Sequence, residues 1–420
     1  MGKQQFANLE LARRRAAVKR HGVMEHLEDY LKNFEHQFKS RGGRIIWAVD
    51  AEEAKKAIIE IFEEHYVKLV VKSKSMITEE IGLTEFLEKN GVECLETDLG
   101  EYIVQISDDK PYHIVTPAMH LSRKDVAAIF HERFGLPADA APEEITAFVR
   151  GELRDKFVKA QVGITGANFL VAGSGSVALT ENEGNGILSM SYPKIHIVVA
   201  GIDKLIPSLS DLELFWPLLA SHGTGQHVTA YNTLVNGPRQ EGESDGPEQM
   251  YVVLLDNGRS NLLAATPQRR AMSCIRCGAC LNACPVYHNV GGHTYGYTYS
   301  GPIGAVISPF MSCQLKEYMH LSYASSLCGK CTEVCPVGID LHHQLLHNRR
   351  RAVKMGLPSR AERRGIKAYK YVMKKARRLE RHSPGTKNFA ARYFMKKHWG
   401  PRRVLPKVVR SFRTRYQDGE

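Results

Sequence analysis

Apolar residues recur every three or four positions near the start of the chain. They are Val23, Leu27, Leu31, Phe34 and Phe38. Because this spacing places the side chains on one face of a helix, it predicts a helical segment over residues 1–43. A pair of glycines at positions 42 and 43 marks where this segment ends.

Further along, short apolar runs alternate with amphipathic stretches. The runs that predict strands are residues 45–49, 68–72, 92–97, 102–106, 113–116, 177–180, 195–200 and 250–255. The stretches that predict helices are residues 50–65, 78–90, 122–133 and 142–160. Strands that alternate with helices indicate an α/β domain on a mainly parallel sheet, which we place at residues 44–258.

Eight of the nine cysteines lie within 62 residues, in two runs that each end in Cys-Pro and an isolated residue between them. The first run contains Cys274, Cys277, Cys280 and Cys284, and the second contains Cys328, Cys331 and Cys335. The C-x₂-C-x₂-C-x₃-C-P spacing is that of bacterial-type ferredoxins, in which the fourth cysteine serves the other cluster. We therefore expect an iron–sulfur module of short helices over residues 266–350.

This spacing assigns ligands to two clusters. The first cluster takes Cys274, Cys277 and Cys280 with Cys335, and the second takes Cys328 and Cys331 with Cys284. The second run is one ligand short, because Ser325 stands where a cysteine would match Cys274. Three alternatives stay open: Cys313 supplies the fourth ligand, a residue other than cysteine does, or the second cluster is [3Fe–4S] instead of [4Fe–4S].

Two other uses of the cysteines fit less well. Structural disulfides need an oxidising compartment, yet the sequence shows neither a signal peptide nor a transmembrane run. Zinc usually binds paired C-x₂-C motifs, not triple runs that end in Cys-Pro. We therefore expect a cytoplasmic protein.

The net charge of +12 averages two different parts of the chain. From residue 349 onward there are 24 lysines and arginines against four acids, whereas the preceding residues carry 33 bases and 41 acids. A basic tail, residues 351–420, thus follows an acidic body. An acidic protein partner or an anionic membrane surface suits an electron carrier, since each basic residue near anionic lipid contributes about 1 kcal/mol. A nucleic acid suits it less. Peripheral association with the inner face of the membrane therefore stays open.

Two polar segments follow predicted strands. In an open α/β sheet ligands bind at such strand ends, so Lys72 and Lys74 together with Glu183 and Asn185 are candidate ligands for a small anion. Capping and turn chemistry explains the same residues equally well. The glycine-rich segment 173–178 leads into a strand, so it predicts a turn better than a dinucleotide site.

Several motifs together resemble the lactate utilisation protein B family over nearly all of residues 1–350. They are residues 72–80, 163–168, 180–185, 237–239 with 245–247, 255–259, 274–280, 301–305 and 323–328. The family has Ser325 as its usual residue and lacks Cys313 in its motif, and the basic tail departs from its pattern. The resemblance implies a LUD domain of sugar-isomerase and CoA-transferase type, followed by a helical ferredoxin-like domain with two [4Fe–4S] clusters.

The resemblance also implies a function. The chain would be a non-catalytic electron-transfer subunit of an oxidoreductase complex that converts L-lactate to pyruvate. Its partners would be two companion lactate utilisation proteins, one with cysteine-rich domains and one with only a LUD domain. For such a subunit we expect electrons to leave to a quinone pool or to another carrier. Two other hypotheses stay open: a small-anion-binding enzyme with structural clusters, and a metal-stapled nucleic-acid-binding protein.

Overall fold

The computed structural model describes residues 2–312, 314–395, 405, 407–410 and 416–417 of the chain. It forms two compact units, Met1–Arg351 and Ala352–Glu420. The first unit holds both sheets and all the cysteines that the model describes. The boundaries of residues 1–43, 44–258 and 266–350 stay predictions, because these segments pack together in that one unit.

A six-stranded sheet is the centre of the first unit, and every strand pair in it is parallel. This confirms the predicted α/β class with a mainly parallel sheet. In spatial order its strands are β1 (Arg44–Ala48), β10 (Gln249–Leu255), β7 (Ile195–Gly201), β4 (Val162–Thr165), β2 (Leu69–Lys72) and β3 (Glu93–Glu96).

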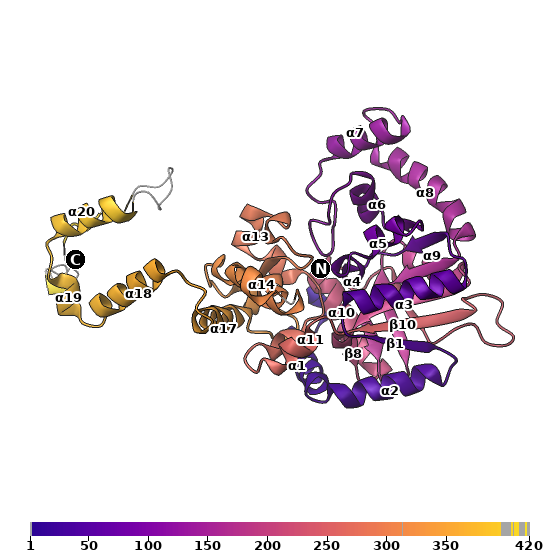
Figure 1. Cartoon of the computed structure of the whole chain (residues 1–420), viewed down its shortest axis with the longest axis horizontal. Helices are drawn as coiled ribbons and strands as arrows, with labels where there is room; N and C mark the ends of the chain where they lie inside the picture. Colours follow the sequence, from indigo (N-terminus) through magenta and orange to yellow (C-terminus); the bar gives the residue numbers. More distant parts are fainter. Residues whose placement is uncertain (1, 313, 396–404, 406, 411–415, 418–420) are drawn as a thin grey trace. The chain divides into compact units, whose positions relative to one another are not determined.

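Both faces of this sheet are buried, as parallel sheets require. In β7, Ile197 and Val199 face one apolar cluster, whereas Val198 and Ala200 face another. Helices α3 (Ala51–Glu64) and α5 (Leu83–Lys89) cover the first face, and α1 (Leu9–Glu25) and α2 (Leu27–Lys39) contribute to the cluster on the second. Figure 1 shows α3 and α2 on opposite sides of β1 and β10. The predicted N-terminal helical segment is thus confirmed as α1 and α2.

A second, four-stranded sheet lies beside the first. Its strands are β8 (Leu205–Ile206), β5 (Phe169–Val171), β6 (Ser176–Glu181) and β9 (Tyr231–Val235). The glycine-rich segment 173–178 includes the turn between antiparallel β5 and β6. Gly175 has φ +66° there, and a Cβ at this position would lie 2.5 Å from the backbone N of Phe38. The interpretation of this segment as a tight turn is therefore confirmed.

The remaining helices of the α/β region surround the sheets. They are α4 (Met76–Glu80), α6 (Leu99–Ile106), α7 (Arg123–Phe134), α8 (Pro142–Lys159), α9 (Asn185–Ser191), α10 (Leu212–Gly223) and α11 (Arg259–Ala264). The predicted strand at 102–106 is wrong, because the Asp98 carboxylate caps α6 by accepting from the Glu101 N–H at 3.1 Å. Residues 113–115 form a bend, and 113–116 contain no strand. Gly82, with φ +61°, splits the predicted helix 78–90 into α4 and α5.

The cysteine runs lie among short helices, as predicted. These are α12 (Ala279–Asn282), α13 (Pro285–Val290), α14 (Gly301–Met311), α15 (Leu315–Tyr318), α16 (Lys330–Glu333) and α17 (Leu341–Lys354). Every residue of α14 is buried, so this apolar helix forms the core of the module. Residues of both cysteine runs belong to the same apolar cluster as the second face of the large sheet.

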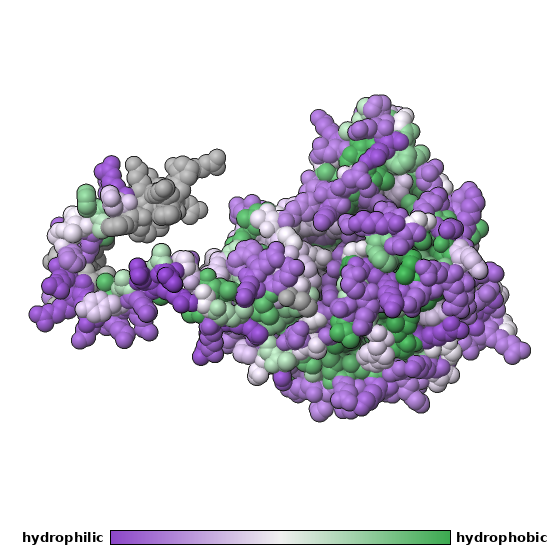
Figure 2. Space-filling view, in the orientation of Figure 1, coloured by the Kyte–Doolittle hydropathy of each residue, from purple (hydrophilic) through white to green (hydrophobic). Residues whose placement is uncertain are grey.

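The second unit is helical, with α18 (Arg360–Met373), α19 (Ala376–Glu380) and α20 (Pro384–Met395). A capping box between Ser359 and Glu362 starts α18. Figure 2 shows hydrophilic residues over much of the α18 surface. In the part of the chain that the structure describes, no helix combines the length and the apolar character needed to span a bilayer.

Candidate iron–sulfur centre and the adjoining cavity

Four cysteines from both runs line one small cavity. Cys274, Cys277 and Cys280 come from the first run, and Cys335 comes from the second. The last three of these are buried, and Cys274 is partly exposed. The structure thus brings together the four residues that the sequence assigns to the first cluster, and their role as ligands stays a prediction.

The surroundings of these thiols fit an iron–sulfur cluster. Burial raises the pKa of Cys277 and Cys280, and the nearby Cys274 raises both further. Burial also raises the pKa of Cys335 to about 11. Protons on such crowded sulfurs are displaced when a soft metal binds the thiolates. The Ile339 N–H donates to the Cys335 Sγ at 3.4 Å, and hydrogen bonds of this kind help to set the potential of a cluster.

The two cysteine runs share one backbone conformation. Arg276 and Leu327 have φ values of +60° and +56°, in a region that residues other than glycine rarely adopt. Two residues later, Gly278 and Gly329 have φ values of +78° and +80°, and each caps a one-turn helix. Such strained positions persist only where the fold requires them. The second loop is therefore a structural repeat of the first.

Ser325 occupies the place of Cys274 in this repeat. The Leu327 N–H donates to the Ser325 Oγ at 3.2 Å, as the Arg276 N–H donates to the Cys274 Sγ at 3.3 Å. The short second run thus keeps the geometry of a complete one, with an oxygen in place of the fourth sulfur.

The remaining cysteines of the runs form a second, more open set. Cys284 is partly exposed, Cys331 is buried and Cys328 is exposed. Burial raises the pKa of Cys331, and the nearby Cys284 and Cys328 add to this shift. The pKa of Cys328 is lowered, chiefly because the backbone N–H of Lys330 donates to its sulfur. Cys313, the candidate fourth ligand, lies outside the described residues.

An N-terminal arginine holds the second run in place. The Arg13 Nη2 donates to the carbonyl of Glu333 at 2.7 Å and to that of Cys335 at 2.8 Å, and its Nε donates to the Cys335 carbonyl at 3.0 Å. Helix α1 therefore fixes the backbone at Cys335, the cysteine of the second run that lines the same cavity as the first set, Cys274, Cys277 and Cys280.

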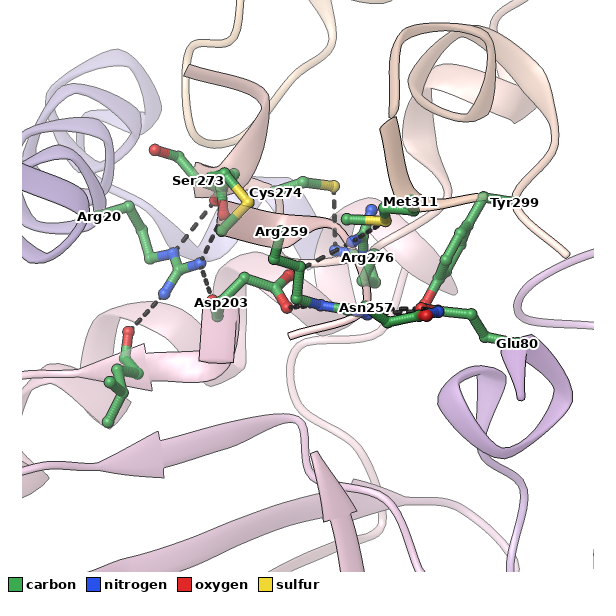
Figure 3. A network of polar contacts seen from close by, with 12 residues as sticks. Arg20, Glu80, Asp203, Asn257, Arg259, Ser273, Cys274, Arg276, Tyr299 and Met311 are labelled. Atoms are coloured by element: carbon green, nitrogen blue, oxygen red, sulfur yellow. Dashed lines mark hydrogen bonds and ion pairs between the residues drawn. The ribbon is translucent and has the colours of Figure 1, made fainter. Parts of the chain in front are cut away.

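A buried charge network joins the first cysteine loop to the large sheet (Figure 3). Arg276 pairs with the Asp203 carboxylate at 3.3 Å, and the Arg259 Nε donates to the same carboxylate at 2.7 Å. Arg259 also binds both oxygens of Glu80, at 2.9 and 2.8 Å. The Tyr299 hydroxyl donates to Glu80 at 2.6 Å, and its ring lies under the Arg276 guanidinium at 4.5 Å.

These pairs determine the charge of the two buried acids. Burial alone would raise the pKa of Glu80, but Arg259 lowers it below its usual value. Arg259 and Arg276 likewise outweigh burial and lower the pKa of Asp203. Both carboxylates therefore stay ionised beside the first cysteine loop.

Arg20 closes the other side of this network. It is 1% exposed and donates to the backbone carbonyls of Ser273, Met272, Asp203 and Leu205. One side chain thus connects α1, the segment before Cys274 and the end of the large sheet. The apolar spacing in α1 gave no signal for this role, because Arg20 lies on its buried face.

A cavity of about 410 Å³ opens at the carboxyl ends of the parallel strands. Segments after β2, β4, β7 and β10 all contribute to its wall, and so does Cys277 of the first cysteine loop. Strand ends of this kind are where open α/β sheets bind ligands. The cavity therefore joins the predicted ligand site of the sheet to the predicted metal centre.

Three of the four predicted anion ligands line this cavity. Lys74, Glu183 and Asn185 are lining residues. The Lys74 Nζ donates to the carbonyl of Val115, and Glu183 accepts from the Leu99 N–H at 3.2 Å. Part of their polar capacity is thus used within the protein, as the turn interpretation expects.

Lys72 is placed differently. Its side chain is fully buried, and its Nζ lies 2.7 Å from Glu96 and 3.4 Å from Glu79. Burial lowers the pKa of an ammonium, but these two acids and Glu101 raise the pKa of Lys72 overall. Its charge is therefore already balanced, and its predicted role as an anion ligand gains no support from this geometry.

Family models place the chain among known proteins. Residues 31–255 match the LUD domain, and residues 270–339 match the 4Fe-4S dicluster domain. These two matches cover the parallel sheet and both cysteine runs.

Curated relatives agree over most of the chain. Lactate utilization protein B of Bacillus velezensis is 46% identical over 87% of this chain and 77% of its own length. The protein of the same name from Bacillus subtilis is 46% identical over 87% of this chain and 76% of its own. In Escherichia coli, the uncharacterized electron transport protein YkgF is 43% identical over 86% of this chain and 75% of its own length. A LUD domain, a 4Fe-4S dicluster domain and these identities together show that the chain belongs to the lactate utilization protein B family.

Proposed function

We propose that this chain is the iron–sulfur electron-transfer subunit of a multi-protein system that oxidises L-lactate to pyruvate. The observation that carries the proposal is the crossing of the two cysteine runs. Cys335 of the second run lines the same cavity as three cysteines of the first. Such crossing is typical of ferredoxins with two clusters, which relay single electrons.

The chain would hold the two clusters close together. Three residues separate Cys280 from Cys284 at the end of α12, and three separate Cys331 from Cys335 at the end of α16. Because α12 and α16 also contact each other, the two sets are linked by two short connections. This arrangement favours electron transfer between the sets.

The two sets differ in their access to solvent, which gives the path a direction. Cys277 and Cys280 of the first set are buried and Cys277 lines the cavity at the strand ends, whereas Cys328 of the second set is exposed. Electrons would enter near the first set and leave from the second to a quinone pool or to another carrier. The two companion lactate utilisation proteins would supply the remaining parts of the reaction.

Reconstitution tests this function. The iron–sulfur-loaded chain is mixed anaerobically with its two companion proteins and L-lactate, and bleaching of the visible cluster absorbance is followed. The proposal predicts bleaching that needs both lactate and the companions, and loss of lactate-dependent electron flow when Cys331→Ser removes a second-set ligand. Bleaching by D-lactate and L-lactate at equal rates, or electron flow that is unchanged by Cys331→Ser, would contradict it.

A further inference from the structure

Two basic side chains, Arg276 and Lys204, line the cavity at the strand ends. The Arg276 side chain is only 9% exposed, and its Nη1 is buried without a hydrogen-bonding partner among the described residues. Lys204 also lines the cavity, and among the described residues its ammonium has no hydrogen bond or direct ion pair. Burial is costly for such groups unless something pairs with them.

The acid nearest to Lys204 and Arg276 does not balance both of these cations. Asp203 is the nearest acid, but it already binds Arg259 at 2.7 Å and Arg276 at 3.3 Å. Burial lowers the pKa of Lys204 to about 8, with Asp203 opposing this shift and Arg276 adding to it. An anion in the cavity would relieve the repulsion between Lys204 and Arg276.

Neutral donors line the same cavity. The hydroxyls of Ser73 and Ser75 follow β2, line the cavity, and are buried without a hydrogen-bonding partner among the described residues. Ser75 packs so tightly that a Cβ on Gly166 would lie 2.7 Å from its Oγ. Two hydroxyl donors and two cations that line one cavity form a set that suits a carboxylate with a second oxygen beside it.

Acidic residues of the cavity set a limit on the charge of the ligand. Asp98, Glu181 and Glu183 also line it. Glu181 is held by the N–H groups of Gly186 and Ile187, at 2.6 and 2.9 Å, so it cannot easily turn away. A ligand with several negative charges, such as a nucleotide phosphate chain, would be repelled there. A small acid with a single carboxylate brings only one negative charge into the cavity and is repelled less.

We propose that this cavity binds a small 2-hydroxy or 2-oxo monocarboxylate, whose carboxylate is held by Arg276 and Lys204. This deepens the proposed function, because it places substrate or product beside Cys277 within this chain. The Tyr299 ring, 4.5 Å from the Arg276 guanidinium, helps to hold this side chain in place. Arg276 and Lys204 are thus ligand-positioning cations, and the adjacent hydroxyls recognise the second oxygen.

Calorimetric titration of the full-length, iron–sulfur-loaded chain tests the site directly. Pyruvate and L-lactate are the probes, acetate lacks the second oxygen, and inorganic phosphate carries more charge. The proposal predicts saturable binding of pyruvate or L-lactate that is at least about tenfold tighter than binding of acetate or phosphate. Equal affinity for acetate or phosphate, or no saturable binding of either 2-substituted acid, would overturn it.

Two variants separate a binding role from a structural one. Lys204→Met should weaken pyruvate binding about tenfold or more while iron and sulfide contents stay unchanged, because Lys204 contributes no hydrogen bond to the fold. Lys124→Met removes an exposed lysine of α7 and serves as the matched control, with unchanged binding. Unchanged affinity in Lys204→Met would contradict the site.

Spectroscopy places the ligand, and it distinguishes this inference from the proposed function. Pyruvate should change the EPR spectrum of the reduced chain, and Lys204→Met should abolish this change at the same pyruvate concentration. A chain that transfers electrons with its companions but shows no pyruvate effect would refute the inference and leave the function standing. A chain that binds pyruvate but passes no electrons would refute the function alone.

Discussion

The Arg276 guanidinium lies 3.3 Å from the Asp203 carboxylate, and this pair joins the first cysteine loop to the end of β7. Arg276 stands between two predicted cluster ligands, whereas Asp203 follows a central strand of the sheet. A shift of the loop would therefore disturb the strand ends, and a ligand bound at the strand ends would in turn shift the loop. The pair thus links the predicted cluster site to the predicted ligand site at the strand ends.

The crossing of the runs gives a first prediction. Because Cys335 and Cys277 line one cavity, Cys335→Ser and Cys277→Ser should remove the same EPR signal from the reduced protein. Cys284→Ser and Cys331→Ser should remove the other signal. Spectra of the four anaerobically purified variants check this, and a match between Cys335→Ser and Cys331→Ser would show that the runs do not cross.

Ser325 gives a second prediction. Since it occupies the place of Cys274 in a repeated backbone conformation, Ser325→Cys should add a fourth sulfur to the second set without rearranging the loop. We expect its visible absorbance to decay more slowly in air than that of the unaltered chain. Ser326→Cys, one position out of phase, is the control that should give no such protection. Equal decay of Ser325→Cys and the unaltered chain would argue that another ligand already completes the second cluster.

A third prediction concerns the buried network. Asp203→Asn would leave Arg259 and Arg276 without their shared carboxylate, and removal of one partner from a buried pair costs about 3–5 kcal/mol. Asp108→Asn breaks an exposed pair with Arg133 and should cost less than about 1 kcal/mol. Anaerobic denaturant unfolding of both variants measures the difference. Similar losses in the two would show that the network does not stabilise the fold.

A fourth prediction follows from a buried acid that faces like charges. Burial and the neighbouring Glu96 raise the pKa of Glu101 above its usual value of 4.5, although Lys72 opposes them. The folded state therefore keeps the proton at a pH where the unfolded state has lost it. The stability that this group contributes is complete below pH 4.5 and is lost as the pH rises through the raised folded value.

Glu101→Gln cannot ionise, so it should reduce the fall in Tm between pH 6 and pH 8.5. Anaerobic calorimetry of the variant and the unaltered chain at about these two pH values checks this expectation. As a control, Glu132→Gln changes an exposed residue of α7 and should keep the original pH dependence. An unchanged slope in Glu101→Gln would mean that Glu101 is ionised in the folded protein.

The fifth prediction concerns the basic tail. All the cysteines that the structure describes belong to the first unit, so removal of residues 360–420 should leave iron and sulfide contents unchanged. The same truncation should weaken salt-sensitive binding to vesicles that contain anionic phospholipid. Sedimentation with vesicles at low and high salt checks this. Equal retention of the truncated chain would remove the membrane surface as a partner of the tail.

Periodicity and cysteine spacing predicted much of this architecture. The strand pairs of the large sheet are parallel, as predicted, and residues of β7 and β10 alternate between two apolar clusters. Helices α1 and α2 include the apolar stripe of residues 23–38. Local signals failed where capping outweighed propensity. Residues 102–106 are apolar enough for a strand, but the Asp98 cap and packing of Tyr102 on Phe130 make them a helix.

The metal centre was easier to predict than the charges around it. Ligand spacing is local, so the sequence alone identified the cysteines that the fold brings together. Arg20 and Asp203 lie 183 residues apart, and the contact between them depends on how α1 packs against the sheet. Lys204 had no motif to identify it, because its importance depends on a cavity wall that several strand ends build together.

The central claim is that this chain carries two iron–sulfur clusters for electron transfer. Iron and acid-labile sulfide analysis of the anaerobically purified chain, with EPR before and after dithionite, tests it most directly. The account predicts about eight irons and eight sulfides per chain, with interacting signals after reduction. About seven irons with a three-iron signal before reduction would leave Ser325 in an incomplete site and require revision of the second cluster. Zinc without sulfide would contradict the account.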